Sequence, residues 1–512
     1  MANAIQPKLG FVVAGLMLGI LTAAMDNTIV ATAMGTIVSE LGGLDKFVWV
    51  TSAYMVAEMA GMPIFGKLSD MYGRKRFFVF GMIVFLLGSA LCGTAQSIEQ
   101  LSLYRAIQGI GGGALMPIAF TIIFDVFPPE KRGKVSGLFG AVFGMSSIFG
   151  PLLGAYITDY ISWHWVFYIN LPIGLVSLGC ILLFYKESLR HAPQKIDWYG
   201  AVTLVGAIVC LMFGLELGGH TYGWSSPQIL GLFAGFIVLF LLFLVIERRV
   251  EEPIISFDMF RNKLYAGSNL VGLFLGIAFI VATVYIPIFI QGVFGGSATN
   301  SGLILLPMML GTVVTAQAGG FLAGSGRMSF RGVMIIFSIL FIISIVLLAT
   351  ITGNTPRWVL TVYMILVGLG VGASFSTLGM AAMHPFDETR RGSASSTMSF
   401  VRTLGMTLGI TIYGLIQRNH FTSGLGEAFG PGAGGGLPGG GFSSDPRALL
   451  SPEARASIPA PVLEKITGVL SESITYAFMW AIVPAVLAFV FALTMGPERM
   501  NHAKAANGPQ GE

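Results

Sequence analysis

Long apolar runs follow one another along almost the whole chain. Each is about 20 residues long, the length that an α-helix needs to cross the hydrocarbon core of a bilayer. Hydrophobic residues make up 54% of the 512 residues and charged residues only 11%, roughly half of the charged fraction of a typical soluble domain. The sequence therefore predicts an all-α protein with fourteen transmembrane spans, near residues 10–38, 46–66, 77–96, 98–124, 134–160, 163–185, 198–217, 227–246, 265–291, 299–323, 331–352, 357–382, 392–417 and 473–495.

The distribution of basic residues predicts how these spans are oriented. Cytoplasmic loops of membrane proteins retain Lys and Arg. Most of the 29 Lys and Arg residues fall in segments on the same side as the N-terminus. We therefore expect a multi-pass protein of the plasma (cell) membrane with both termini in the cytoplasm. Asp26 interrupts the first apolar run, which favours a first transmembrane helix over a cleaved leader peptide.

A glycine-rich segment occurs twice at a constant spacing. Tyr104 and Gly109 in YRAIQGIGGGALMP return as Tyr363 and Gly368 in YMILVGLGVGA, 363 − 104 = 259 residues later. This spacing corresponds to six spans plus an inserted pair, so the halves are expected to be parallel repeats related by an axis along the membrane normal. The expected units are a six-helix bundle at 1–185, two accessory helices with linkers at 186–264, a second six-helix bundle at 265–495 and a cytoplasmic tail at 496–512.

Arg105 lies inside the first copy of this segment, whereas the second copy has Met364 at the matching position. Arg105, Gly109 and Gly113 are spaced four residues apart, which places the arginine on a smooth helix face where another helix can pack closely. With a rise of about 1.5 Å per residue, Asp26 comes to nearly the same depth as Arg105. We expect the two to form a pair that takes part in proton coupling, because ionisable residues inside a membrane usually mark a pathway. A purely structural ion pair is the alternative.

Further polar residues lie within the apolar runs. Glu58, near the middle of the second run, is a candidate for cation or proton binding, and the alternative is a neutral, hydrogen-bonded carboxylic acid. The repeat spacing pairs Glu58 with Gln317. Arg402 lies one to two turns inside the cytoplasmic surface, where it either serves the transport site or reaches phosphate headgroups. We expect a substrate cavity lined by Asp26, Tyr54, Glu58, Gln317 and Arg402.

The loop after the second run carries the most specific motif of the chain. GKLSDMYGRKR, residues 66–76, resembles the G-x-L-[AS]-D-x-x-G-R-[KR] loop of the major facilitator superfamily. RxxQG from Arg105 adds to the resemblance, and Gly150, Pro151 and Gly154 are close to the pattern of its antiporters. MDNTIVATAM and WHWVFYINLPIG look like the fourteen-span drug:proton antiporter family. The resemblance covers essentially the full length and is greatest to multidrug exporters of Gram-positive bacteria.

This resemblance implies the major facilitator fold, in which two six-helix bundles enclose a cavity that opens alternately to each side. Asp70 is expected to dock on a helix start in the other half, because a carboxylate near a helix N-terminus is stabilised by roughly 0.3 to 1 kcal/mol. The residues carried over from the family to gating and conformational change are Gly66, Asp70, Gly73, Arg74, Gly109, Gly150, Pro151 and Gly154.

The implied function is export of lipophilic, often cationic, drugs in exchange for protons. Asp26 is the best candidate for the shared site of proton and substrate, Arg105 for its partner and Glu58 for a second acid. GMPIFGKL, residues 61–68, nearly matches a phosphate-binding loop, but Leu68 replaces the required hydroxyl, so we expect no use of ATP. We expect a monomer that uses the proton gradient and needs no metal, other cofactor or nucleic acid.

Three other functions are weighed against this one. A narrow-substrate exporter, for example of tetracycline or an endogenous metabolite, shares every motif. A proton-coupled importer is disfavoured by Gly150 and Pro151. A membrane enzyme has no support, since the sequence has no cluster of metal ligands or nucleophiles and its three cysteines lack a metal or redox spacing.

The stretch 418–472 is expected to form one long external loop. It contains GPGAGGGLPGGG, residues 430–441, which is typical of a flexible spacer. The following SPEARASIPAPVLEKI is expected to form a short surface helix.

Overall fold

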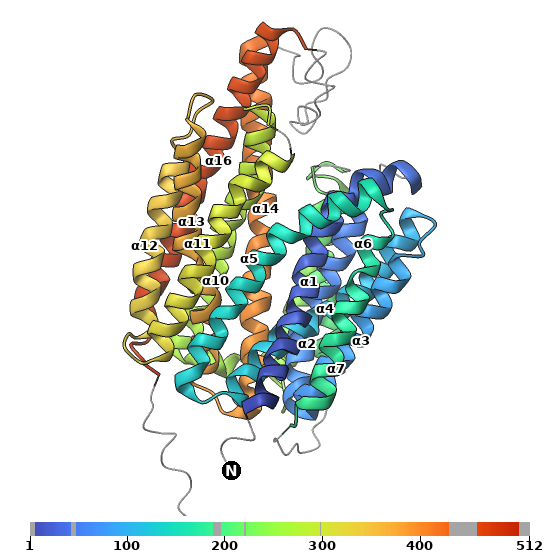
Figure 1. The fold of residues 1–512 in the computed structure, drawn as a ribbon, viewed down its shortest axis with the longest axis vertical. Coiled ribbons are helices and arrows are strands. Elements are labelled where there is room, and N and C mark those ends of the chain that lie inside the picture. Colours follow the sequence, from blue (N-terminus) through green and yellow to red (C-terminus); the bar gives the residue numbers. More distant parts are fainter. Residues whose placement is uncertain are drawn as a thin grey trace, which may run out of the picture.

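The computed structural model describes residues 6–41, 48–187, 196–219, 222–296, 298–429 and 458–500. Nearly all of this part of the chain is helical (Figure 1). The α-helices are α1 (Gln6–Leu41), α2 (Val48–Tyr72), α3 (Arg74–Cys92), α4 (Ile98–Val126), α5 (Pro129–Tyr160), α6 (Trp165–Tyr168), α7 (Asn170–Phe184), α8 (Trp198–Leu217), α9 (Pro227–Glu247), α10 (Lys263–Gly292), α11 (Ala298–Gly324), α12 (Phe330–Leu348), α13 (Arg357–Met383), α14 (Arg391–Phe429) and α16 (Ala460–Thr494), with 3-10 turns η1 (Phe257–Arg261) and η2 (Glu388–Arg390).

The helices account for the predicted membrane spans. Thirteen helical segments of the described chain are long and apolar enough to cross a bilayer, with α6 and α7 forming one of them. The remaining predicted span corresponds to α2, which has 25 residues and packs against α4 and α14. The prediction of an all-α, multi-pass membrane protein is therefore confirmed.

Two helix bundles lie side by side (Figure 1). In the first half, α1 packs on α5 and α7, and α4 packs on α2 and α3. In the second half, α10 packs on α14 and α16, and α13 packs on α11 and α12. The accessory helices α8 and α9 pack on each other, and Leu204 and Ile208 of α8 join a buried apolar cluster with Val56 and Met59 of α2.

The halves meet where α2 crosses α14 and where α5 crosses α11. A Cβ on Gly66 would lie 2.8 Å from the carbonyl oxygen of Gly392, and a Cβ on Gly133 would overlap the carbonyl oxygen of Gly320. The two crossings are therefore equivalent in the repeat. Gly392 follows Gly133 by 392 − 133 = 259 residues, and Gly320 follows Gly66 by 320 − 66 = 254 residues. Only glycine permits such close backbone approach. We call the end of the molecule that contains these two crossings, and at which α1 begins, the closed end.

Away from the closed end, the crossing helices turn back to their own halves. A Cβ on Gly154 of α5 would lie 2.8 Å from the carbonyl oxygen of Ile29 in α1, and a Cβ on Gly409 of α14 would lie 2.7 Å from that of Ile277 in α10. Figure 1 shows α5 running from the second half at the closed end to the first half at the opposite end. The packing therefore joins the halves at one end.

The repeat offset is not constant, which corrects one pairing made from the sequence. A Cβ on Gly113 would lie 2.5 Å from the carbonyl oxygen of Glu58, and the matching Gly372 meets the carbonyl oxygen of Thr312. The counterpart of Glu58 is thus Thr312, 312 − 58 = 254 residues later, and not Gln317. The reason is that the path from α11 to α13 is five residues longer than that from α2 to α4, since 372 − 312 = 60 and 113 − 58 = 55.

The predicted external loop at 418–472 is also corrected. α14 continues to Phe429 and α16 begins at Ala460, so much of this stretch is helical. The two helix ends pack together, with the amide of Gln417 donating to the Ser473 hydroxyl at 2.9 Å and the His420 and Tyr476 rings 4.4 Å apart. Residues predicted to form a short surface helix therefore belong in part to a long helix, and the glycine stretch 430–441 lies outside the described residues.

The close glycine crossing predicts a steric effect of substitution at Gly392. A methyl group there would lie 2.7 Å from the Gly66 carbonyl oxygen, so we expect Gly392→Ala to separate the halves at the closed end. The clash should outweigh the roughly 1 kcal/mol that Ala gains over Gly in a helix. Pulsed EPR distances between spin labels at the exposed Arg76 and Arg390, one on each side of this crossing, should lengthen and broaden in a background without the native cysteines. Gly414→Ala is the matched control, because that position of α14 has no atom within 4 Å; equal distance distributions for both variants would contradict the crossing.

Candidate functional site

A buried acid–base pair lies inside the first half. Asp26 of α1 is 0% exposed and Arg105 of α4 is 1% exposed. The guanidinium of Arg105 donates to Oδ2 of Asp26. The two residues that the sequence placed at one depth are therefore in direct contact, and their proposed part in proton coupling stays a prediction.

Two amide side chains complete the surroundings of Asp26. Gln108 and Asn170 both donate to its Oδ1, at 2.8 and 2.9 Å. Gln108 also accepts from Arg105 at 2.7 Å, and Asn170 also donates to the Ser89 hydroxyl at 3.0 Å. Helices α1, α3, α4 and α7 thus meet at one carboxylate, which we call the Asp26 network.

The sequence analysis did not assign either amide to the site. Gln108 follows Arg105 by three residues, so the two share a helix face. Asn170 is a polar residue at the start of an apolar helix, inside a motif that was noted only for its family resemblance. Polarity on the shared face could have indicated Gln108. Only tertiary packing brings Asn170 to Asp26, 144 residues away in the chain.

Tyr54 lies beneath the pair. The guanidinium of Arg105 is 4.1 Å from the centre of the Tyr54 ring, and its Nε donates to the carbonyl of Val50 at 3.4 Å. Stacking of this kind is favourable because the face of an aromatic ring attracts a cation. Tyr54 is 0% exposed, so in this conformation it supports Arg105 and does not face an open cavity.

Small residues of α5 hold α1 close to the pair. The hydroxyl of Thr28 donates to the carbonyl of Ser146 at 3.1 Å, and a Cβ on Gly150 would overlap the Thr28 side chain. Pro151 lies inside the helix between Gly150 and Gly154. The small residues of this antiporter-like pattern therefore allow α5 to pack closely against α1 at Thr28, two residues after Asp26.

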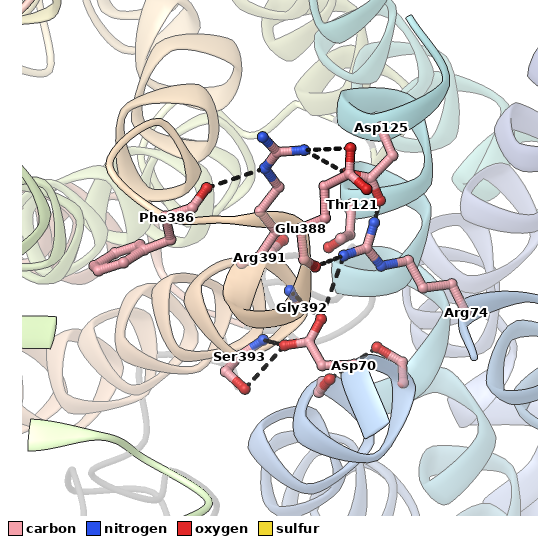
Figure 2. Close-up of polar contacts among 12 residues, drawn as sticks. Asp70, Arg74, Thr121, Asp125, Phe386, Glu388, Arg391, Gly392 and Ser393 are labelled. Atoms are coloured by element: carbon pink, nitrogen blue, oxygen red, sulfur yellow. Dashed lines mark hydrogen bonds and ion pairs between the residues drawn. The ribbon is translucent and has the colours of Figure 1, made fainter. Parts of the chain in front are cut away.

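A second polar cluster joins the halves at the closed end (Figure 2). Asp70 accepts hydrogen bonds from the backbone N–H groups of Gly392 and Ser393, at 2.8 and 2.7 Å, and from the Ser393 hydroxyl at 3.1 Å. These N–H groups belong to the first turn of α14, which has no internal acceptors for them. The carboxylate of α2 thus caps a helix of the other half, as expected for Asp70.

Arg74 and Asp125 extend this cluster. The buried guanidinium of Arg74 lies 3.4 Å from Asp70, donates to the carbonyl of Glu388 and pairs with Asp125 at the end of α4. Arg391 pairs with the same carboxylate at 2.8 Å (Figure 2). We call the cluster formed by Asp70, Arg74, Asp125, Glu388, Arg391, Gly392 and Ser393 the latch.

Gly73 makes the turn that presents Arg74. Its φ of 112° lies in a region that residues with a Cβ rarely adopt. Gly326, in the longer turn between α11 and α12, also has a positive φ, of 68°. The sequence did not single out Asp125 or Arg391, although both are charged residues at the ends of apolar runs.

Comparison with known proteins decides the family. The model of the Major Facilitator Superfamily matches residues 16–198 and 190–410. The chain belongs to the major facilitator superfamily. Multidrug resistance protein 3 of Bacillus subtilis (strain 168) is 58% identical over 496 residues, which cover 97% of this chain and 96% of that protein. Multidrug transporter protein MdtP of the same organism is 34% identical over 528 residues, covering 99% of this chain and 96% of that protein.

Solved structures support the same fold. The human organic anion transporter MFSD10 (TETRAN) aligns with a TM-score of 0.61 at 15% identity, covering 94% of this chain and 99% of that chain. The proton:xylose symporter XylE aligns with a TM-score of 0.59 at 14% identity, covering 98% and 99%. At these identities the likeness concerns the major facilitator fold alone.

The other sequence candidates form no hydrogen bond or ion pair with the Asp26 network in the described chain. Glu58 is half-buried on α2, one turn after Tyr54, and makes no hydrogen bond or ion pair within the described chain. Gln317 lies in the contact between α11 and α5, where a Cβ on Gly137 would come within 2.6 Å of its side-chain oxygen. Arg402 is half-buried on α14, 4.9 Å from the ring centre of Phe375. That these three residues line a substrate cavity with Asp26 and Tyr54 stays a prediction.

The latch predicts how Asp70→Asn affects the halves. The substitution removes the negative charge beside Arg74 and the α14 N-terminus, a loss of about 1 kcal/mol, which corresponds to roughly five-fold in the closed-to-open ratio. We expect longer EPR distances across the closed end and slower turnover, with ethidium affinity almost unchanged. Asp258→Asn is the control, because Asp258 forms an ion pair with Arg261 on the exposed surface. A large loss of affinity at normal turnover would be inconsistent with a gating role.

Proposed function

We propose that this member of the superfamily exports lipophilic and cationic drugs in exchange for protons. Two relatives that align with nearly the whole chain are named as multidrug resistance and multidrug transporter proteins. The observation that carries the coupling is the buried pair of Asp26 and Arg105, present in one half only. Because transport accounts for these features, we propose no enzymatic activity for this chain. We take 1–185, 186–264 and 265–495 as the functional units.

The Asp26 network suits an ionised carboxylate. All three of its side-chain contacts come from donors: Arg105, Gln108 and Asn170. A proton on Asp26 would turn one acceptor oxygen into a donor that needs an acceptor. The Oδ1 atom of Asn170 is buried and has no hydrogen-bond partner in the described chain. Rotation of this amide would present that oxygen to a protonated Asp26, so proton uptake would rearrange the contact between α1 and α7.

α2 connects the Asp26 network to the latch. Tyr54 stacks under Arg105 and Asp70 caps α14, 70 − 54 = 16 residues further along the same helix. At a rise of about 1.5 Å per residue, these positions are roughly 24 Å apart. Movement of Arg105 on protonation of Asp26 would therefore shift α2 and weaken the contacts of Asp70 in the latch.

We assign the closed end to the cytoplasm, because the excess of Lys and Arg lies on that side. This conformation would then admit protons to Asp26 from outside and release drug there. Protonation would weaken the latch and open the cytoplasmic end, where the next drug molecule binds as the proton leaves. The cycle needs no ATP, and both termini remain cytoplasmic.

A narrow-substrate exporter is the second candidate, since it would use the same pair and the same latch. The names of the relatives favour a broad range of drugs. Transport assays in proteoliposomes under an imposed pH gradient distinguish the two candidate functions. A multidrug exporter moves several unrelated compounds, whereas a narrow-substrate exporter moves one. A proton-coupled importer would instead move substrate with the gradient.

The buried pair predicts coupled effects of substitution. Asp26→Asn should abolish uphill ethidium export in proteoliposomes and leave downhill flux intact, because the carboxylate can no longer gain or lose a proton. Arg105→Met, the residue of the second repeat, should cause a similar loss, since it leaves Asp26 unpaired in apolar surroundings at a cost of about 3 kcal/mol. The double variant should be no worse than either single one.

Asp258→Asn provides the surface control for these measurements. Additive losses in the double variant would show that the two residues act separately. Uphill export by Asp26→Asn would refute the coupling role of this carboxylate.

A further inference from the structure

Arg402 lies deep within the second half. It follows the first residue of α14 by 402 − 391 = 11 positions, so it is roughly 16 Å from that helix start. Its guanidinium is 4.9 Å from the ring of Phe375, which precedes the end of α13 by 383 − 375 = 8 positions, or roughly 12 Å. By both measures, the guanidinium lies about two to three helical turns from the helix ends at the closed end. Stacking on Phe375 favours a role within the protein over contact with headgroups.

The charge of Arg402 has no protein counter-ion. Within the described chain, its guanidinium contacts no carboxylate and donates no hydrogen bond. The two fully buried arginines of the described chain differ, since Arg105 pairs with Asp26 and Arg74 pairs with Asp70 and Asp125. An unpaired intramembrane arginine is unfavourable unless a water-filled space or a ligand satisfies it. Arg402 is also half-buried, whereas Arg105 is 1% exposed.

Arg402 shares a helix face with a residue that contacts the other half. Ser395, two turns earlier on the same face, donates to the carbonyl of Pro117 in α4 at 3.0 Å. Above this contact, α14 leaves the first half and packs on α10. Arg402 therefore lies two turns beyond the contact between the halves, at the level where a Cβ on Gly276 of α10 would come within 2.7 Å of the Arg402 carbonyl oxygen. The matching position of α5 is Phe143, because 402 − 259 = 143, so the first half lacks this charge.

An aromatic surface adjoins the guanidinium. Phe375 of α13 lies under it, and Phe279 of α10 meets the Phe375 ring edge-on, with 6.2 Å between ring centres. Stacking occupies one face of the guanidinium plane. Its five N–H donors point outward in that plane and remain available for two parallel hydrogen bonds to a carboxylate.

We propose that Arg402, Phe375 and Phe279 form an anion-accepting subsite that binds the carboxylate of a lipophilic aromatic substrate. The exporter then handles carboxylate-bearing amphiphiles, including zwitterions, in addition to cations. The subsite rests on the proposed export function for its physiological use. A lipid phosphate could offer similar chemistry to Arg402, and the experiment separates these two sources of the anion.

The test uses two dyes that differ in one group. Rhodamine B carries a free carboxylate and its ethyl ester does not, while both carry the same aromatic cation. Binding is measured by fluorescence titration of the full-length protein in nanodiscs, and export is measured in proteoliposomes under a pH gradient. We expect Arg402→Gln to weaken rhodamine B binding roughly ten-fold or more, the value of a charge-assisted hydrogen bond, and to leave the ester within two-fold.

Two further variants control for charge and for general damage. Arg402→Lys should retain part of the preference for rhodamine B, because it keeps the charge and loses the bidentate geometry. Arg327→Gln should change neither dye, since Arg327 also stacks on a phenylalanine, Phe321, but lies exposed in the turn between α11 and α12.

The outcomes are distinct. Equal loss of both dyes in Arg402→Gln would assign Arg402 a structural role and overturn the subsite. Unchanged rhodamine B binding would also overturn it, and would leave a lipid phosphate as the partner of the arginine. Export of the ester together with no binding of rhodamine B by the unmodified protein refutes the subsite and retains the export function. Arg402-dependent binding without export of either dye supports the subsite and refutes the export function.

Discussion

The buried contact between Asp26 and Arg105 constrains the packing of the first half, because a charge inside a bilayer is stable only beside a partner. The contact requires α1 and α4 to lie close to each other and to α2. Gly109 and Gly113 provide this closeness on α4, where a Cβ would meet the backbone of Tyr54 or Glu58. Within the described residues the second half has no such pair: Met364 stands at the position of Arg105 and Met308 at that of Tyr54, and both are 0% exposed. Repeated backbones can thus hold different chemistry.

α2 is the element that links this pair to the closed end. One face of it carries Tyr54 under Arg105, and its last turns carry Gly66 and Asp70 at the crossing with α14. Pro63 lies between them and lacks the N–H of one helical hydrogen bond. The helix is therefore easiest to bend at Pro63. In the proposed cycle, a bend at Pro63 would change how far a displacement at Arg105 moves Asp70, so this proline would modulate the coupling between the two sites.

The sequence predicted the features that depend on local patterns. Apolar length predicted the helices, matching depths predicted the contact of Asp26 with Arg105, and the charge of Asp70 predicted its place on a helix start. It did not predict Asn170, because its contact with Asp26 depends on the packing of α7 against α1. The pairing of Glu58 with Gln317 was wrong because it assumed one constant offset, whereas the path from α11 to α13 has five more residues than the path from α2 to α4. Helix continuation past 417 was missed since polar residues there pack between α14 and α16, and polarity alone suggested a loop.

The two crossings at the closed end explain why a duplicated fold can respond to one charge. Gly66 with Gly392 and Gly320 with Gly133 form equivalent backbone contacts, so the halves are held at two related points. Asp70 caps α14 at the first crossing, but its counterpart at the second, 254 residues later, is Gly324. Contact at the second crossing depends on the fit of backbones, which changes little with charge. Contact at the first depends on a carboxylate among N–H groups and two arginines. In the proposed cycle, a change in electrostatics would therefore loosen the first crossing while the second holds the halves together, so that the closed end opens by rotation about α5 and α11.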